Sequence, residues 1–188
     1  MKRKFITALL FTGLIYGFTF HRTETYKVDT QKSVVEWAAE KKNGKHNGTI
    51  AVSGGEIRNK KGMISGSIEI DMNTIHVSDL SDTASEHKLE KSLKGPGFFD
   101  VEKYPKATFV ITSVTSHKTP RNMCKVEGDL TIRDKTNKVS FDAEIKMEGK
   151  QFTCTGTYIV NRAMFGIAPD NKSAKDDFTV TFNIIANK

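Results

Sequence analysis

Hydrophobic and polar residues alternate along most of the chain that follows its first twenty residues. In residues 64–72 the even-numbered positions are apolar or glycine, whereas the odd-numbered positions are polar. The same period of two runs through residues 126–132, 141–147 and 178–184. Because successive side chains of a β-strand point to opposite faces, each of these segments predicts a strand with one apolar face.

The alternation is interrupted at two places. A predicted strand that carries Ile50 and Val52 runs into Ser53-Gly54-Gly55, and glycines inside a strand indicate a β-bulge or a sharp bend. The phase of the alternation changes again near Ile75 and Val77, which indicates a second bulge. Beyond the N-terminal segment no long stretch has a helical period, so the chain is expected to be all-β.

Residues 89–109 depart from this pattern. Leu89 and Leu93 lie four residues apart among lysines and glutamate, which predicts a short helix with one apolar face, and Gly95-Pro96-Gly97 ends it. Phe98-Phe99 follows at once, in a position where a loop is normally polar. We interpret this stretch as the one long connection between strands, with two rings that close an apolar opening; the alternative is that the rings belong to an ordinary core.

Strands of this number, joined mostly by short turns, are typical of an antiparallel sandwich or barrel. Charged residues fill the outward positions, which excludes a barrel whose outer face contacts lipid. We therefore predict an eight-stranded antiparallel barrel with its apolar residues inside, where they fill the interior or leave room for one small ligand. Small residues at inward positions would favour leaving space, and these are Gly66, Gly128, Ala143 and Gly156.

Length and charge limit the remaining classes. A chain of 188 residues suits one domain whose core needs no disulfide or metal. The formal charge is +7, but Lys2-Arg3-Lys4 supplies three of these charges and leaves +4 for the rest. This mild excess does not predict nucleic-acid binding.

An uncharged apolar run, residues 5–20, follows the basic cluster directly. It is shorter than a typical membrane-spanning helix and is diluted by threonine and glycine, so residues 1–20 are predicted to be a signal peptide, with an uncleaved N-terminal anchor as the alternative. Residues 21–25 are then a polar spacer and residues 26–188 the barrel. Export would place the protein in the periplasm or outside the cell.

Export also raises the question of a disulfide between Cys124 and Cys154. A turn predicted at residues 134–137 places Cys124 opposite Met147, and a turn at Gly149-Lys150 places Cys154 opposite Ile145. The thiols would then lie on strands separated by a third, about 9 to 10 Å apart, which is beyond the ~7 Å that a disulfide tolerates. We expect two free thiols that pack as small apolar residues.

No sequence motif indicates a catalytic or metal site. The five histidines do not stand at ligand spacing, and although His46 and His76 could meet in space, a pair without a third ligand is a weak metal signal. A lipid-modifying hydrolase or isomerase would need His46, His76 or Arg162 in a polar cluster inside the barrel, where the inward positions are almost all apolar. No metal and no cofactor are expected.

Several segments resemble one known family. The sequences FFDVEKYPKATF (98–109), GDLTIRDKT (128–136) and NRAMFGI (161–167) are similar to those of the YceI-like family of exported lipid-binding proteins, and the resemblance extends over residues 26–185. Two positions depart from it: Met164 stands where many members have an acidic residue, and Gly97 precedes the FFD segment in place of an acidic residue. These changes concern a headgroup contact rather than the fold.

The resemblance implies a lipocalin-like, eight-stranded barrel whose elongated apolar cavity holds a polyisoprenoid or another long-chain lipid, with no cofactor and no catalytic residues. The candidate wall residues, with Phe98 and Phe99 near the mouth, are Trp37, Ile50, Ile68, Ile70, Phe109, Leu130, Phe141, Ile145, Phe152, Tyr158 and Phe182. The alternatives to such a carrier are the lipid-modifying enzyme and a filled barrel that serves as a stress-response or interaction module. Transient contact with a membrane surface and a homodimer stay open.

Overall fold

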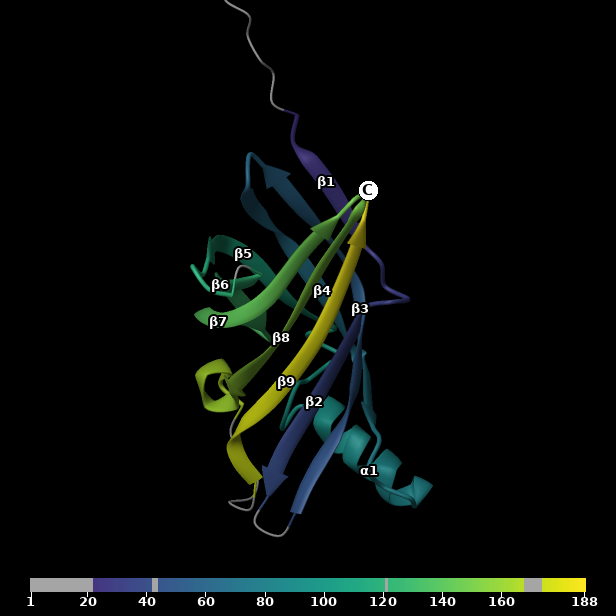
Figure 1. Cartoon of the computed structure of the whole chain (residues 1–188). Helices are drawn as coiled ribbons and strands as arrows, with labels where there is room; N and C mark the ends of the chain where they lie inside the picture. The colour runs from purple at the N-terminus through teal and green to yellow at the C-terminus, as the bar shows by residue number, and fades with distance from the viewer. Residues whose placement is uncertain (1–21, 42–43, 121, 168–173) are drawn as a thin grey trace, which may run out of the picture.

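The computed structural model describes residues 22–41, 44–120, 122–167 and 174–188, so the predicted leader lies outside the described residues. The described chain folds into an antiparallel β-barrel with one α-helix and one 3-10 helix outside the sheet (Figure 1). In chain order the elements are β1 (Glu24–Val28), β2 (Val34–Lys41), β3 (Gly44–Lys60), β4 (Met63–Val77), α1 (Thr83–Lys94), β5 (Lys106–Ser116), β6 (Met123–Ile132), β7 (Lys135–Glu148), β8 (Gln151–Asn161), η1 (Arg162–Phe165) and β9 (Ala174–Asn187).

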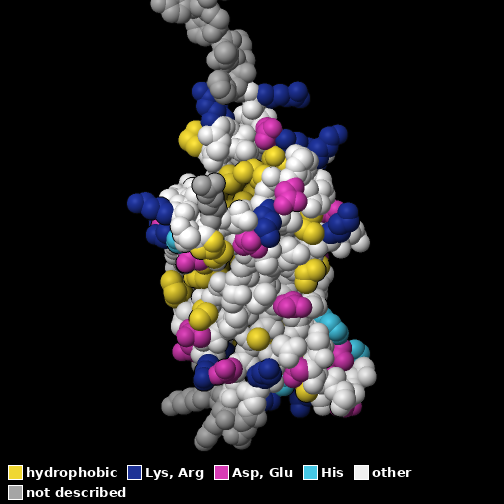
Figure 2. Space-filling model, viewed as in Figure 1, with side chains coloured by type: hydrophobic (Ala, Val, Ile, Leu, Met, Phe, Trp, Pro, Cys, Tyr) yellow, Lys and Arg dark blue, Asp and Glu magenta, His cyan; other side chains and the backbone are white. Residues whose placement is uncertain are grey.

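The sheet closes because β3 pairs with both β2 and β4. The sheet contains nine strands in eight positions. β1 and β2 share one position, because each of them pairs with β3 on one side and with β9 on the other. They occupy different parts of β3, since Tyr26 of β1 pairs with Ile57 and Val35 of β2 pairs with Ile50. The predicted eight-stranded antiparallel barrel is therefore confirmed. Figure 2 shows charged side chains of both signs over the outer surface, as the outward polar positions predict.

Both predicted bulges are present in the long β3–β4 ladder. Its register shifts between Val52 and Gly54, and Gly55 has a φ of +143°, in the region that favours glycine. A Cβ at Gly55 would lie 2.3 Å from the Ser67 carbonyl oxygen, so the close approach of the strands requires glycine there. The second shift lies between Thr49 and Ala51, where the buried positions of β4 change phase.

The β6–β7 turn differs from its prediction. It consists of Arg133 and Asp134 alone, with Arg133 at a φ of +58°, because Thr136 joins the ladder opposite Thr131. Cys124 therefore lies opposite Ala143, and its predicted pairing with Met147 is wrong.

The β7–β8 turn lies where it was predicted, so Cys154 pairs with Ile145. The prediction of two free thiols is confirmed: Cys124 and Cys154 form no disulfide. Cys124 is buried and Cys154 is half-buried, as expected for thiols that pack as small apolar residues.

The apolar interior consists of two clusters along the barrel axis. The cluster at the end that carries β1, called here the β1 end, contains Tyr26, Val35, Val52, Ile57, Ile64, Ile68, Cys124, Val126, Ala143, Ile145, Phe152, Ile184 and Ala186. The cluster at the opposite end, called here the α1 end, contains Met72, Ile75, Val101, Ala107, Ile132, Val160, Phe165 and Ile167. Ile50, Ile70 and Val180 pack against both clusters and mark the middle of the barrel.

Two of the inward glycines, Gly128 and Gly156, make room for rings rather than for empty space. A Cβ at Gly128 would lie 2.4 Å from the Phe109 ring, and one at Gly156 would lie 2.8 Å from the Phe182 ring. The expectation that these small residues leave space is wrong at both positions, because a ring from a neighbouring strand lies over each glycine.

The long connection between β4 and β5 carries α1. The helix begins six residues before the predicted apolar pair, since the Asp82 carboxylate caps it by accepting a hydrogen bond from the Ser85 N–H at 2.9 Å. It ends at Lys94, just before Gly95, as predicted. This connection is not the only long one, because η1 lies between β8 and β9. Within the described residues neither helix has the length and apolar character of a membrane-spanning segment.

Candidate functional site

The interior of the barrel contains a cavity of about 530 Å³, a size typical of small-molecule sites. Its walls come from strands β2 to β9, together with α1 and the chain that follows the helix. Every wall residue expected from the sequence lines it, and these are Trp37, Ile50, Ile68, Ile70, Phe98, Phe99, Phe109, Leu130, Phe141, Ile145, Phe152, Tyr158 and Phe182. That they contact a ligand stays a prediction.

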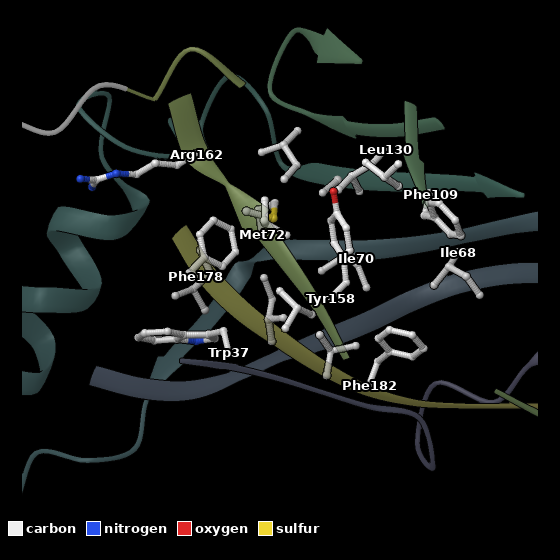
Figure 3. A pocket seen from close by; sticks show the side chains of 18 of the residues that line it. Trp37, Ile68, Ile70, Met72, Phe109, Leu130, Tyr158, Arg162, Phe178 and Phe182 are labelled. Atoms are coloured by element: carbon white, nitrogen blue, oxygen red, sulfur yellow. The ribbon is translucent and has the colours of Figure 1, made fainter. Parts of the chain in front are cut away.

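Aromatic rings form one continuous wall of this cavity. The Phe141 ring centroid lies 5.5 Å from that of Phe109, 5.4 Å from that of Tyr158 and 5.4 Å from that of Phe182. Ring pairs at such distances attract one another beyond the burial of their area, so the wall is held in shape. Figure 3 shows Phe109, Tyr158 and Phe182 directed toward a common space.

Tyr158 and Trp37 are wall residues that each carry one polar side-chain atom. The Tyr158 hydroxyl lies among apolar side chains (Figure 3), and burial raises the pKa of Tyr158, so the phenol is neutral at physiological pH. The indole Nε1 of Trp37 is buried and has no hydrogen-bond partner among the described residues. The Trp37 ring packs over Gly48, where a Cβ would lie 2.9 Å from its Cζ2 atom.

Among the described lining residues, the four charged side chains and one histidine lie toward the α1 end, where they mark the mouth of the cavity. These lining residues are Glu40, Lys41, His46, Arg162 and Lys175.

A chain of polar contacts runs along one side of the mouth. Lys41 Nζ lies 2.7 Å from His46 Nε2, and His46 Nδ1 lies 2.9 Å from the Asp79 carboxylate. Burial opposes the ionisation of Asp79, but hydrogen bonds from the Asn47 N–H and the His46 ring outweigh it and hold the pKa of this carboxyl below its usual range. Lys175 pairs with Glu40 nearby.

Arg162 lies on the other side of the mouth and is only 4% exposed. Its Nε donates to the Asp176 carboxylate at 3.3 Å, and its guanidinium carbon lies 5.6 Å from the Phe98 ring centroid. Figure 3 shows the guanidinium directed away from the apolar side chains of the interior.

Phe98 and Phe99 cover the cavity beside this arginine. The Phe99 N–H donates to the Leu93 carbonyl at 3.0 Å, and the Phe98 carbonyl accepts from the Arg133 side chain (Nη1) at 3.1 Å, so hydrogen bonds tie this segment to α1 and to the β6–β7 turn. The Phe99 ring meets Phe178 edge to face at 6.4 Å between centroids. Both rings are half-buried and pack against the α1-end cluster, which places them at the mouth.

A family model described as the YceI-like domain matches residues 26–186. The chain belongs to the YceI-like family. A UPF0312 protein of Pseudomonas syringae pv. tomato is 34% identical over 106 residues, which cover 53% of this chain and 54% of that protein. A UPF0312 protein of Staphylococcus aureus (strain USA300) is 38% identical over 87 residues, which cover 42% of this chain and 46% of that protein. The chain thus spans about half the length of the curated relatives it matches.

Two solved structures share the fold of this YceI-like barrel. Burkholderia cenocepacia BcnA is similar with a TM-score of 0.71 and 24% identity, over 85% of this chain and 99% of that one. A polyisoprenoid binding domain from Saccharophagus degradans, implicated in plant cell wall breakdown, is similar with a TM-score of 0.60 and 10% identity, over 86% of this chain and 97% of that one.

Several residues that line the YceI-like cavity were not predicted from the sequence. Phe178 and Val180 share the alternation of Phe182 on β9, so the pattern contained the signal. Ile167 lies beyond η1, outside any alternating segment, and no pattern marks it. Of the residues considered for an enzyme, His46 and Arg162 reach the mouth of the cavity, whereas His76 does not line it.

Proposed function

We propose that this protein is an exported, non-enzymatic carrier that binds a polyisoprenoid or a similar long-chain lipid inside its barrel. The observation that carries the proposal is the distribution of the described lining residues, which are predominantly apolar in the interior and charged at the mouth. A ligand with a long apolar tail and a polar head matches this distribution. The tail would lie along the aromatic wall and the head beside Lys41, His46 and Arg162.

The hydrophobic effect is sufficient to hold such a ligand. Removing apolar surface from water stabilises a complex by about 25 cal/mol per Å², before the cost of immobilising both partners is subtracted. A long hydrocarbon chain therefore needs an apolar tunnel rather than specific polar partners. The similar fold of the polyisoprenoid binding domain from S. degradans supports the choice of an isoprenoid.

The cavity argues against the two alternative functions. A filled barrel would have no interior space of about 530 Å³. A lipid-modifying enzyme would need reactive groups beside the apolar interior, and in the described part of the cavity the charged groups lie at the mouth and are engaged with one another, as in the pairs His46–Asp79 and Lys175–Glu40.

Export is proposed from the sequence of residues 1–20, with the periplasm or the extracellular space as the destination. N-terminal sequencing of the protein recovered from outside the cytoplasm tests this. A mature N-terminus near residue 21 is expected, and a cytoplasmic protein that retains Met1 would contradict export.

Organic extraction of the purified full chain, followed by mass spectrometry, tests lipid binding. We expect about one long-chain lipid per protein. The Val180→Phe variant should retain much less lipid, because Val180 lies in the middle of the cavity and a larger side chain would obstruct it.

The matched control is Val110→Phe, which makes the same change on β5 at a side chain that is 45% exposed. It should retain as much lipid as the unmodified protein. An extract without lipid, or equal retention by Val180→Phe with its fold intact, would contradict the proposal.

A further inference from the structure

Outside the cavity, a histidine of β4 meets two glutamates of α1. His76 Nδ1 lies 2.8 Å from Glu90 Oε1 and 3.5 Å from Glu86 Oε1, and all three ligand atoms lie within 4.8 Å of one another. In the part of the chain that the structure describes, this is the one group of three histidine, cysteine or acidic side chains that converge in this way. Figure 2 shows histidine and acidic side chains side by side over the region of α1.

The backbone of α1 places two of these side chains on one face, and a backbone hydrogen bond orients one of them. Glu86 and Glu90 are four residues apart and therefore lie on one face of α1. Glu90 Oε1 also accepts a hydrogen bond from the Val77 N–H at 3.0 Å, which orients its carboxylate toward the end of β4. The side chains of Glu86 and Glu90 are 21% and 15% exposed, whereas His76 is 53% exposed and leaves the cluster open to solvent.

This geometry suits a divalent transition metal. Zinc is bound by histidine nitrogen and carboxylate oxygen at about 2.0 to 2.2 Å in a tetrahedral arrangement, which places neighbouring ligand atoms about 3.3 to 3.5 Å apart. The two distances from His76 Nδ1, 2.8 and 3.5 Å, are within a small side-chain rotation of that separation.

We propose that His76 Nδ1, Glu86 and Glu90 form a binding site for Zn²⁺ that joins α1 to β4, with water in the fourth position. The metal ion would replace the proton that otherwise lies between His76 Nδ1 and Glu90, and it would neutralise the repulsion between the two carboxylates. An ordinary ion pair between a protonated His76 and the glutamates is the competing account, and it predicts no metal affinity.

The site has a consequence for the mouth of the cavity. α1 has no buried residue, yet its Leu89 and Leu93 line the cavity. A metal ion between α1 and β4 would hold these two side chains over the interior. This consequence rests on the proposed carrier function, whereas metal binding itself does not.

Titration calorimetry of the full chain with zinc chloride, produced without a histidine tag and freed of lipid, tests the site. We expect one Zn²⁺ per chain, and a loss of affinity of about tenfold or more in each of His76→Gln, Glu86→Gln and Glu90→Gln. Glu86→Gln is the most informative of these variants, because it preserves the bond between Glu90 and the Val77 N–H and hence the attachment of α1. Circular dichroism shows whether each variant keeps its fold.

His117→Gln is the matched control. His117 Nε2 also contacts a carboxylate, that of Asp142, at 2.8 Å, but no third ligand from the described residues converges there. This variant should keep the full Zn²⁺ affinity. Equal zinc binding by the unmodified protein and by folded Glu86→Gln, or an equal loss in His117→Gln, would overturn the site.

The absorption spectrum of bound Co²⁺ provides a second test, because a cluster that binds no metal would not give such a spectrum. Co²⁺ at this site should give the visible absorption of a tetrahedral complex, and Glu86→Gln should abolish it. An octahedral Co²⁺ spectrum in the unmodified protein would contradict the proposed ligand set. Because neither titration involves lipid, failure of the zinc site would leave the carrier proposal untouched.

Discussion

The two ends of the barrel are built differently. At the β1 end the interior is closed by side chains that are almost fully buried: Tyr26 is 2% exposed and Phe152 is 1% exposed, with 6.2 Å between their ring centroids. At the α1 end the helix buries no residue, and the half-buried Phe98 and Phe99 share the mouth with charged side chains. The β1 end is therefore closed by packed side chains, whereas the α1 end is suited to admit a ligand.

The contacts explain why the ends should also differ in mobility. β1 is held by backbone ladders with β3 and β9 and by burial of Tyr26. The contacts of α1 with β4 include polar ones, such as that between His76 and Glu90, and ion pairs near the surface contribute little to stability. Local opening should therefore require less free energy at the α1 end than at the β1 end.

The largest expected effect comes from truncating the core of the β1 end. Phe152→Ala should lower the free energy of unfolding by about 3 to 5 kcal/mol, because it removes a buried ring and leaves a void against Tyr26. Urea denaturation measures this loss. Ile159→Ala on the same strand is the control, since Ile159 is 59% exposed, and it should change stability by less than about 1 kcal/mol. Equal losses in the two variants would contradict the account that packed side chains close the β1 end.

A smaller effect on stability and a larger one on ligand retention are expected at the α1 end. The double variant Phe98→Ser, Phe99→Ser should release bound lipid at least about tenfold faster, because it removes both rings from the mouth, while the free energy of unfolding falls by less than in Phe152→Ala. Transfer of lipid to acceptor vesicles measures release, and urea denaturation measures stability.

The double variant Val110→Ser, Ile159→Ser controls for polarity alone, because both side chains are exposed on the outside of the barrel. It should release lipid at the rate of the unmodified protein. If the Phe98→Ser, Phe99→Ser protein released lipid at an unchanged rate and lost much of its stability, the two rings would be ordinary core residues.

The smallest effect concerns thiol reactivity at the two ends. Cys154 packs against the β1-end cluster, and burial raises its pKa to about 12, with the neighbouring Cys124 contributing. Since the thiolate is the reactive form, Cys154 should be alkylated slowly in the folded protein at pH 8, and both thiols should react after denaturation. A thiol introduced at the α1 end by Leu93→Cys should react faster. Mass spectrometry of the alkylated protein measures the rates, and faster labelling of Cys154 would show that the β1 end is the open one.

Much of the fold could be predicted from the alternation of residues. It identified the strands around Ile68, Leu130 and Phe141, because each has a repeated apolar face. It did not identify β1, whose single buried residue, Tyr26, cannot form a pattern. The β6–β7 turn was placed incorrectly because Arg133 adopts a positive φ that non-glycine residues seldom take, and no local signal marks this.

The candidate site could be predicted where it lies on strands and not where it depends on tertiary structure. Alternation identified Phe141 and Phe182 of the aromatic wall, because both lie on the apolar faces of predicted strands. Arg162 reaches the mouth from η1, and the cluster of His76 with Glu86 and Glu90 forms only because α1 lies against β4. Spacing along the sequence cannot show such contacts between separate elements.

The fluorescence of Trp37 reports on ligand binding inside the barrel, since it is the only tryptophan of the chain and lines the cavity. Titration of the lipid-free protein with a long-chain prenyl alcohol should shift its emission in a saturable manner at about one ligand per chain, and Val180→Phe should suppress the shift. A lack of any shift in the unmodified protein, or an equal shift in Val180→Phe, would contradict the account that the interior of the barrel binds the lipid.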